Sequence, residues 1–166
     1  MLSRERVLDV VSPVAMIFPG YHLDAADINE ALDDGVASCA SRAFASGILL
    51  RDAYPNENLY EIKFGVAPEH ATEYTGKNGD YVGMGHCVVS FCVPGSTPWI
   101  VDSYTDSTIE VVRPSEEHEG YEWAGLEEGY RAYLANAELG DVEVNTDELL
   151  AHLVSLGSGT SQVITT

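Results

Sequence analysis

A cysteine, a histidine and an aspartate lie far apart in this sequence, in positions that suit thiol chemistry. From Gly35 to Arg51 apolar residues recur at helical spacing, and Ser38, directly before that pattern, is a residue type that caps helices. Cys39 is therefore expected at the first helical position, where unpaired backbone N–H groups and the helix dipole favour a thiolate. Such a thiolate attacks carbonyl carbons when the fold supplies a base and a group that orients the base.

Two β-rich segments supply candidates for that base and its partner. The alternating segment GMGHCVVSFCV places His86 and Val88 on one face, and the next segment, WIVDSY, carries Asp102 between apolar neighbours. If residues 94–96 form a three-residue hairpin loop, Val88 lies opposite Asp102. His86 then lies one diagonal step from Asp102 on the same face, whereas a two-residue loop would separate them. This register predicts that Asp102 orients His86, which exchanges a proton with Cys39.

The rest of the chain predicts an α+β domain with helices first, then an antiparallel meander, then helices. Helices are expected over residues 3–11, 24–33, 126–139 and 145–156. The cysteine helix is expected to end around residues 52–55. Residues 14–18 fit a short strand or a buried connector. Strands are expected over residues 60–66, 81–93, 99–104 and 108–113. We predict one domain over residues 1–157, with the cysteine helix packed on the sheet, and a flexible tail over residues 158–166.

The composition narrows the classes of partner. The chain has 166 residues, with 27 acidic against 8 basic side chains and a formal net charge of −19, which repels nucleic-acid phosphates and anionic lipid. No stretch is long enough to span a bilayer, and no signal-peptide pattern is present, so a cytoplasmic protein is expected. Three cysteines do not imply a disulfide framework. Cys87 and Cys92 are interpreted as core residues.

The order of Cys39, His86 and Asp102 on helix, strand and strand resembles the core of the transglutaminase-like superfamily, a distant relative of papain-type proteases. The matching stretches are GVASCASRAF, GHCVVSF and PWIVDSY, within residues 35–104. The resemblance implies a transglutaminase-like fold with Cys39 as nucleophile, His86 as base and Asp102 as orienter. It also implies acyl transfer or hydrolysis at a peptide or protein amide, through a thioester and without a cofactor.

The sequence departs from the superfamily at two positions near the nucleophile. Ala40 follows Cys39 where the family often has an aromatic residue, and Asp33 stands where papain-type enzymes have a glutamine that assists the oxyanion. The oxyanion would then depend on the backbone N–H of Cys39 and a second donor, Tyr21 or His22. A non-catalytic binding or scaffold domain is the alternative. A metal site of the same three residues is chemically possible, but no CxxC or HExxH motif accompanies them.

Overall fold

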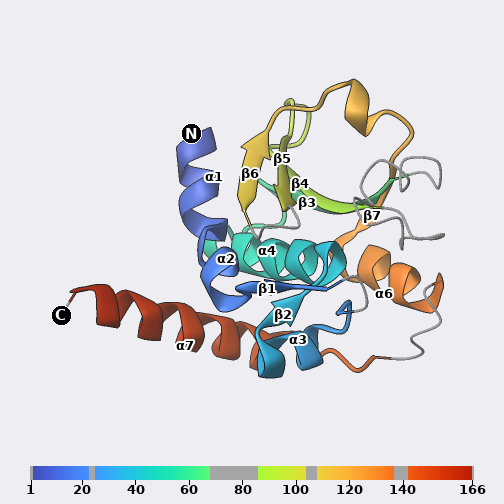
Figure 1. Cartoon of the computed structure of the whole chain (residues 1–166). Helices are drawn as coiled ribbons and strands as arrows, with labels where there is room; N and C mark the ends of the chain where they lie inside the picture. Colours follow the sequence, from blue (N-terminus) through green and yellow to red (C-terminus); the bar gives the residue numbers. More distant parts are fainter. Residues whose placement is uncertain (1, 23–24, 68–85, 104–107, 137–141, 166) are drawn as a thin grey trace.

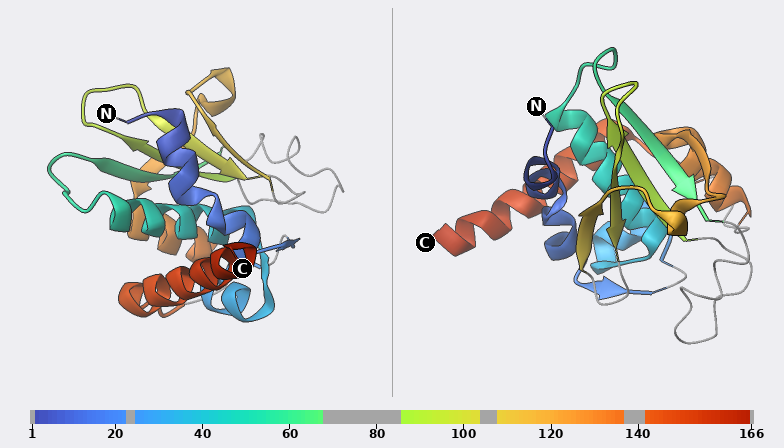
Figure 2. Two further views of the ribbon diagram at one scale, coloured as in Figure 1. Left: turned by 90° about the vertical axis from the view of Figure 1, so that its left-hand side faces the viewer. Right: turned by 90° about the horizontal axis from the view of Figure 1, so that it is seen from above.

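The computed structural model describes residues 2–22, 25–67, 86–103, 108–136 and 142–165 of the chain (Figure 1). Its architecture is α+β, with an antiparallel sheet on one side and helices beneath it, which confirms the α+β part of the predicted fold class. Helix α4 (Cys39–Ala53) lies directly under the sheet. A further layer of short helices, a small parallel strand pair and the C-terminal helix lies beyond α4 (Figures 1 and 2).

The described strands form a five-stranded antiparallel sheet in the order β6-β5-β4-β3-β7. They are β3 (Glu61–Val66), β4 (Cys87–Cys92), β5 (Trp99–Ser103), β6 (Ile109–Val112) and β7 (Glu122–Gly125). The sequence predicted four of these, although residues 81–85 and 104 of the predicted strands lie outside the described residues. It missed β7, because a strand of four residues carries little periodic signal and is held by its pairing with β3.

The register between β4 and β5 decides whether the predicted base can meet its partner. Val89 pairs with Val101. Extending that ladder by one residue puts Val88 across from Asp102, so the predicted register is confirmed. Gly95 has a φ of 86°, the left-handed conformation expected in the connecting turn. The ladder ends before the turn, so the connecting loop is longer than the three residues predicted while the register is the same.

The helices follow their predicted positions with three differences. They are α1 (Arg4–Val11), α2 (Pro13–Ile17), α3 (Ile28–Asp34), α4, α6 (Leu126–Asn136) and α7 (Thr146–Thr165). The helix predicted over residues 24–33 begins only at Ile28, where the side chain of Asp27 caps it. Residues 137–139 of the helix predicted over residues 126–139 lie outside the described residues. Residues 13–17 are helical rather than a strand or connector, because proline is well tolerated in a first helical turn. Helix α7 continues to Thr165 through Gly157 and Gly159, so most of the predicted tail over residues 158–166 lies within this helix.

The central helix α4 is more deeply buried than its sequence pattern predicts. Every residue from Cys39 to Ile48 is buried, not just the predicted apolar face. The sheet covers one side of the helix, and α1, α3, α6 and α7 contact it elsewhere. Gly47 allows one of these contacts, since a Cβ there would lie 2.4 Å from a methyl carbon of Leu126. The helix that begins with Cys39 is therefore held firmly in the core.

Two short strands connect the first helices to α4. Strand β1 (Gly20–Tyr21) pairs in parallel with β2 (Val36–Ala37), with Tyr21 opposite Ala37. The backbone N–H of Gly20 donates to the carbonyl of Gly35 at 3.0 Å, which extends the pairing. Because β2 leads directly into α4, this strand pair places β1 beside the N-terminus of that helix.

Candidate active site

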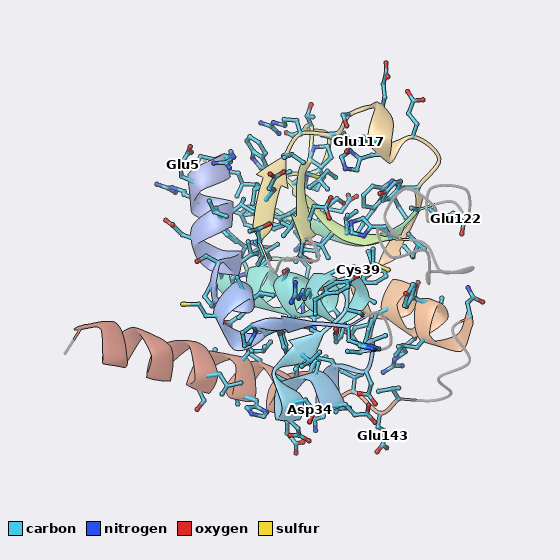
Figure 3. All side chains as sticks on the ribbon, viewed as in Figure 1. Glu5, Asp34, Cys39, Glu117, Glu122 and Glu143 are labelled. Atoms are coloured by element: carbon cyan, nitrogen blue, oxygen red, sulfur yellow. The ribbon has the colours of Figure 1, made fainter. Side chains whose placement is uncertain are left out.

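Cys39 is the first residue of α4, as the capping pattern predicts (Figure 3). Ser38 precedes it in an extended conformation, and the backbone N–H of Ser38 donates to Oγ of Ser41 at 2.9 Å. The Ser41 hydroxyl in turn donates to the carbonyl of Ala25 at 2.7 Å. These bonds hold the first turn of the helix in one geometry. The Cys39 side chain sits where the helix dipole favours negative charge, and the residue is 1% exposed.

His86 and Asp102 lie next to each other where strand β4 begins and strand β5 ends. Nε2 of His86 lies 2.5 Å from Oδ1 of Asp102, and both side chains are about nine-tenths buried. His86 also forms a side-chain hydrogen bond with Cys39. Since Nε2 is bound to the carboxylate, Nδ1 is the nitrogen left for the sulfur. The structure thus brings the three residues named from the sequence into one hydrogen-bonded chain.

Hydrogen bonds and charges within the site lower the pKa of Cys39 and raise the pKa of His86. The pKa of the Cys39 thiol lies well below its usual value, because a hydrogen bond from Cys87, and then the hydrogen bond and positive charge of His86, outweigh burial. Burial by itself lowers the pKa of His86, but the hydrogen bonds and charges of Asp102 and Cys39 raise it to about 10. A thiolate paired with an imidazolium is therefore the favoured state at neutral pH.

Cys87 is a member of this site that the sequence interpretation missed. It is buried in the core, as predicted, but its side chain and its backbone N–H both hydrogen-bond with Cys39. Burial, the hydrogen bond and the charge of Cys39 all raise the pKa of Cys87, so it stays a thiol that donates to the neighbouring sulfur. The sequence signal for this role was that Cys87 directly follows His86. Strand alternation puts neighbouring side chains on opposite faces, so it gave no reason to place Cys87 beside Cys39.

Two tyrosines border the site. The Tyr21 hydroxyl hydrogen-bonds with the side chain and the backbone N–H of Cys39. Tyr121, from the segment before β7, is half-buried; burial and then the nearby charges of Asp102 and Cys39 raise its pKa. Its ring stacks on Trp123 with centroids 6.0 Å apart. The sequence pointed to Tyr21 as one of two possible donors.

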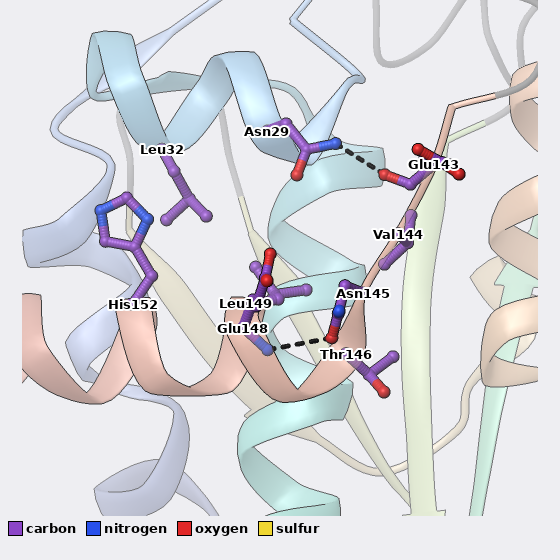
Figure 4. A pocket seen from close by; sticks show the side chains of 9 residues that line it. All are labelled: Asn29, Leu32, Glu143, Val144, Asn145, Thr146, Glu148, Leu149 and His152. Atoms are coloured by element: carbon purple, nitrogen blue, oxygen red, sulfur yellow. Dashed lines mark hydrogen bonds between the residues drawn. The ribbon is translucent and has the colours of Figure 1, made fainter.

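A surface cavity among the described residues lies away from this site. It has a volume of about 750 Å³ and lies between α3 and the start of α7, where the side-chain amide of Asn29 donates to the carbonyl of Glu143 (Figure 4). None of the three predicted catalytic residues lines it. Within the described part of the chain, no group of three or more His, Cys, Asp or Glu side chains is arranged to hold a metal ion. Nor does any helix among those residues have the length and apolar character needed to cross a membrane.

Comparisons with protein-family models, with curated proteins and with solved structures found no significant match to this chain. The fold class and the geometry of the site therefore come from the structure, and the resemblance to the transglutaminase-like superfamily stays a prediction.

Proposed function

We propose that this protein is a cysteine-dependent enzyme of transglutaminase-like type, which performs acyl transfer or amide hydrolysis through a thioester on Cys39. The observation that carries this proposal is the hydrogen-bonded chain from Cys39 through His86 to Asp102, with the sulfur at a helix N-terminus. Nucleophile, base and orienting group are the three parts that such chemistry needs. We propose membership of the transglutaminase-like superfamily on the same three residues.

The steps follow from the charges of the site. The Cys39 thiolate attacks the amide carbon, so that a C–S bond forms and the π electrons of the carbonyl move onto oxygen. The C–N bond then breaks, and the His86 imidazolium gives its proton to the departing amine. Neutral His86 takes a proton from water or from an incoming amine, which attacks the thioester and releases Cys39. Asp102 holds the imidazole in one tautomer and stabilises its charge throughout.

The proposed substrate is an amide of a peptide or protein. The net charge of −19 favours neutral or cationic chains over anionic ones. We also propose a reducing, cytoplasmic setting, because none of the three cysteines, all of which lie among the described residues, forms a disulfide, and two of them hydrogen-bond with each other in reduced form.

The test combines thiol labelling with turnover of an activated ester, p-nitrophenyl acetate. We expect iodoacetamide to label Cys39 at pH 7, and Cys39→Ala to lower the rate of p-nitrophenolate release by about 1000-fold, to background. Cys92→Ala is the matched control, since Cys92 lies at the other end of β4, and it should leave both measurements unchanged. Undiminished turnover in Cys39→Ala, or a Cys39 that iodoacetamide does not modify, would contradict the proposal.

A non-catalytic binding domain is the second candidate, and the burial of Cys39 favours it, because a residue that is 1% exposed restricts access to the sulfur. The pKa of Cys39, measured from alkylation rates against pH, separates the two candidates. A value near that of a free thiol, about 8.5, supports the binding domain, and a clearly lower value supports the enzyme.

A further inference from the structure

We propose that Tyr21 is a catalytic residue whose hydroxyl donates a hydrogen bond to the oxyanion, beside the backbone N–H of Cys39. The inference rests on the proposed thiol chemistry and supplies the second donor that the sequence left open between Tyr21 and His22. Acyl transfer needs such donors, because the carbonyl oxygen becomes negatively charged when the sulfur attacks.

The contacts of the hydroxyl place it where that charge develops. In the free protein it accepts a hydrogen bond from the backbone N–H of Cys39 and hydrogen-bonds with the Cys39 side chain. A carbonyl carbon bonded to the sulfur carries its oxygen within reach of the same N–H, since that group lies on the residue that forms the bond. The phenol of Tyr21 is therefore next to both the attacking atom and the site of the new charge.

The movement of charge during the reaction gives the hydroxyl its role. Before attack, the negative charge is on the sulfur of Cys39, and the Tyr21 O–H donates to it. After attack, the sulfur is a weak acceptor and the charge is on oxygen, so the same O–H stabilises the oxyanion. Burial, and then the charge of Cys39, raise the pKa of Tyr21, which keeps the phenol protonated and able to donate.

Strand and helix contacts hold Tyr21 in this position. It pairs with Ala37 in the β1–β2 ladder, two residues before Cys39. Arg42, which is buried one turn into α4, donates from Nη2 to the carbonyl of Gly20 at 2.7 Å. Its guanidinium carbon lies 5.2 Å from the centroid of the Tyr21 ring. The strand that carries the phenol is thus tied to the same helix that carries the nucleophile.

Two reactions of the same sulfur test this role. Acylation by p-nitrophenyl acetate passes through an oxyanion, whereas alkylation by iodoacetamide displaces iodide at a saturated carbon and forms none. We expect Tyr21→Phe to slow acylation of Cys39 by about 100-fold. Alkylation should change by less than about threefold, because Cys87 and His86 still stabilise the thiolate. Tyr60→Phe is the matched control, since Tyr60 packs against Tyr54 and Phe91, and it should change neither rate.

The remaining outcomes overturn the inference. Equal losses in both reactions would make Tyr21 a residue that supports the thiolate, and no loss in either would remove it from the site. Absence of both reactions at Cys39 in the unmodified protein would reject the proposed function and the inference together. If Tyr21→Phe does not fold, 3-fluorotyrosine at the same position replaces it. Its more acidic phenol should speed acylation without speeding alkylation, and an unchanged acylation rate would count against the inference.

Discussion

The two ends of strand β4 each carry a cysteine, and their surroundings differ sharply. At the start of the strand, Cys87 lies beside Cys39 and the imidazole of His86, within the core. At the end, Cys92 is only partly buried. There, burial and the charge of Glu61 raise the pKa of Cys92, although the positive charge of Lys63 opposes them.

A more exposed thiol in this protein is not the more easily ionised one. Cys39 is 1% exposed, yet its pKa is lowered, because hydrogen-bond donors and an imidazolium surround the sulfur. At the more accessible Cys92, partial burial and then the charge of Glu61 raise the pKa, and no imidazolium among the described residues offsets them. Reactivity should therefore follow the neighbours supplied by adjacent elements rather than contact with solvent.

Removing the imidazole of His86 should have the largest effect on the difference in reactivity between Cys39 and Cys92. His86→Ala deletes both the base and the positive charge beside Cys39, so the rate of acylation by p-nitrophenyl acetate should fall by about 1000-fold. The control is His152→Ala, because His152 is exposed on α7 and lines the cavity that lies away from the triad. Comparable losses in the two variants would show that the effect is not specific to the triad.

Changing the orienting carboxylate should have the next largest effect. Asp102→Asn keeps the size of the side chain but removes its charge, so the imidazole loses its preferred tautomer and its raised pKa. We expect acylation to slow by about 100-fold. The pKa of His86, followed by NMR titration, should fall from about 10 toward the ordinary 6.5. A His86 pKa that is unchanged in this variant would be inconsistent with the proposed role of Asp102.

The pH dependence of alkylation compares the two thiols directly. Cys39 should react with iodoacetamide from below pH 7 upward, with a further change near pH 10 as His86 loses its proton. Cys92 should react appreciably only above the ordinary thiol pKa, about 8.5. At pH 6 we expect Cys39 to be labelled about 10-fold faster, as measured by mass spectrometry of the two peptides. Faster labelling of Cys92 at that pH would reverse the comparison.

The hydrogen bonds from Cys87 can be tested separately from those of His86. Cys87→Ala removes one donor to the Cys39 thiolate and keeps the backbone N–H, so the midpoint of the alkylation profile should rise by about one pH unit. Cys92→Ala removes the cysteine at the other end of the strand and should leave the midpoint in place. An unshifted midpoint in Cys87→Ala would mean that the imidazolium of His86 accounts for the lowered pKa without this bond.

The smallest expected effect is on stability. The raised pKa of His86 contributes stability that is fully present below about pH 6.5 and is lost as pH rises through about 10. The lowered pKa of Cys39 contributes stability that is present above about pH 8.5 and is lost as pH falls through its folded value. Where the two pH windows overlap, below about pH 8.5, the two contributions change in opposite directions and offset each other. From pH 8.5 to 10, the free energy of unfolding should fall by about 1.4 kcal/mol per pH unit more than in His86→Gln, by urea titration. Equal slopes in the two proteins would contradict a paired imidazolium.

Local rules in the sequence determined the parts of the site that depend on neighbouring residues. Ser38 marked the start of the helix at Cys39, and the cap is a bond within one turn, from the backbone N–H of Ser38 to the hydroxyl of Ser41. The register that aligns Asp102 with His86 followed from strand alternation and from the turn at Gly95, since side chains alternate with a period of two residues. The α+β class followed from the order of the segments.

Tertiary structure alone decided which distant groups surround the sulfur. Cys87 and Tyr21 contact Cys39 because β4 and β1 both meet the N-terminus of α4, and no local pattern encodes that meeting. The burial of α4 on all sides and the pairing of β7 likewise depend on elements remote in the sequence. Packing between separate elements sets these contacts, whereas periodicity and capping act only along one element.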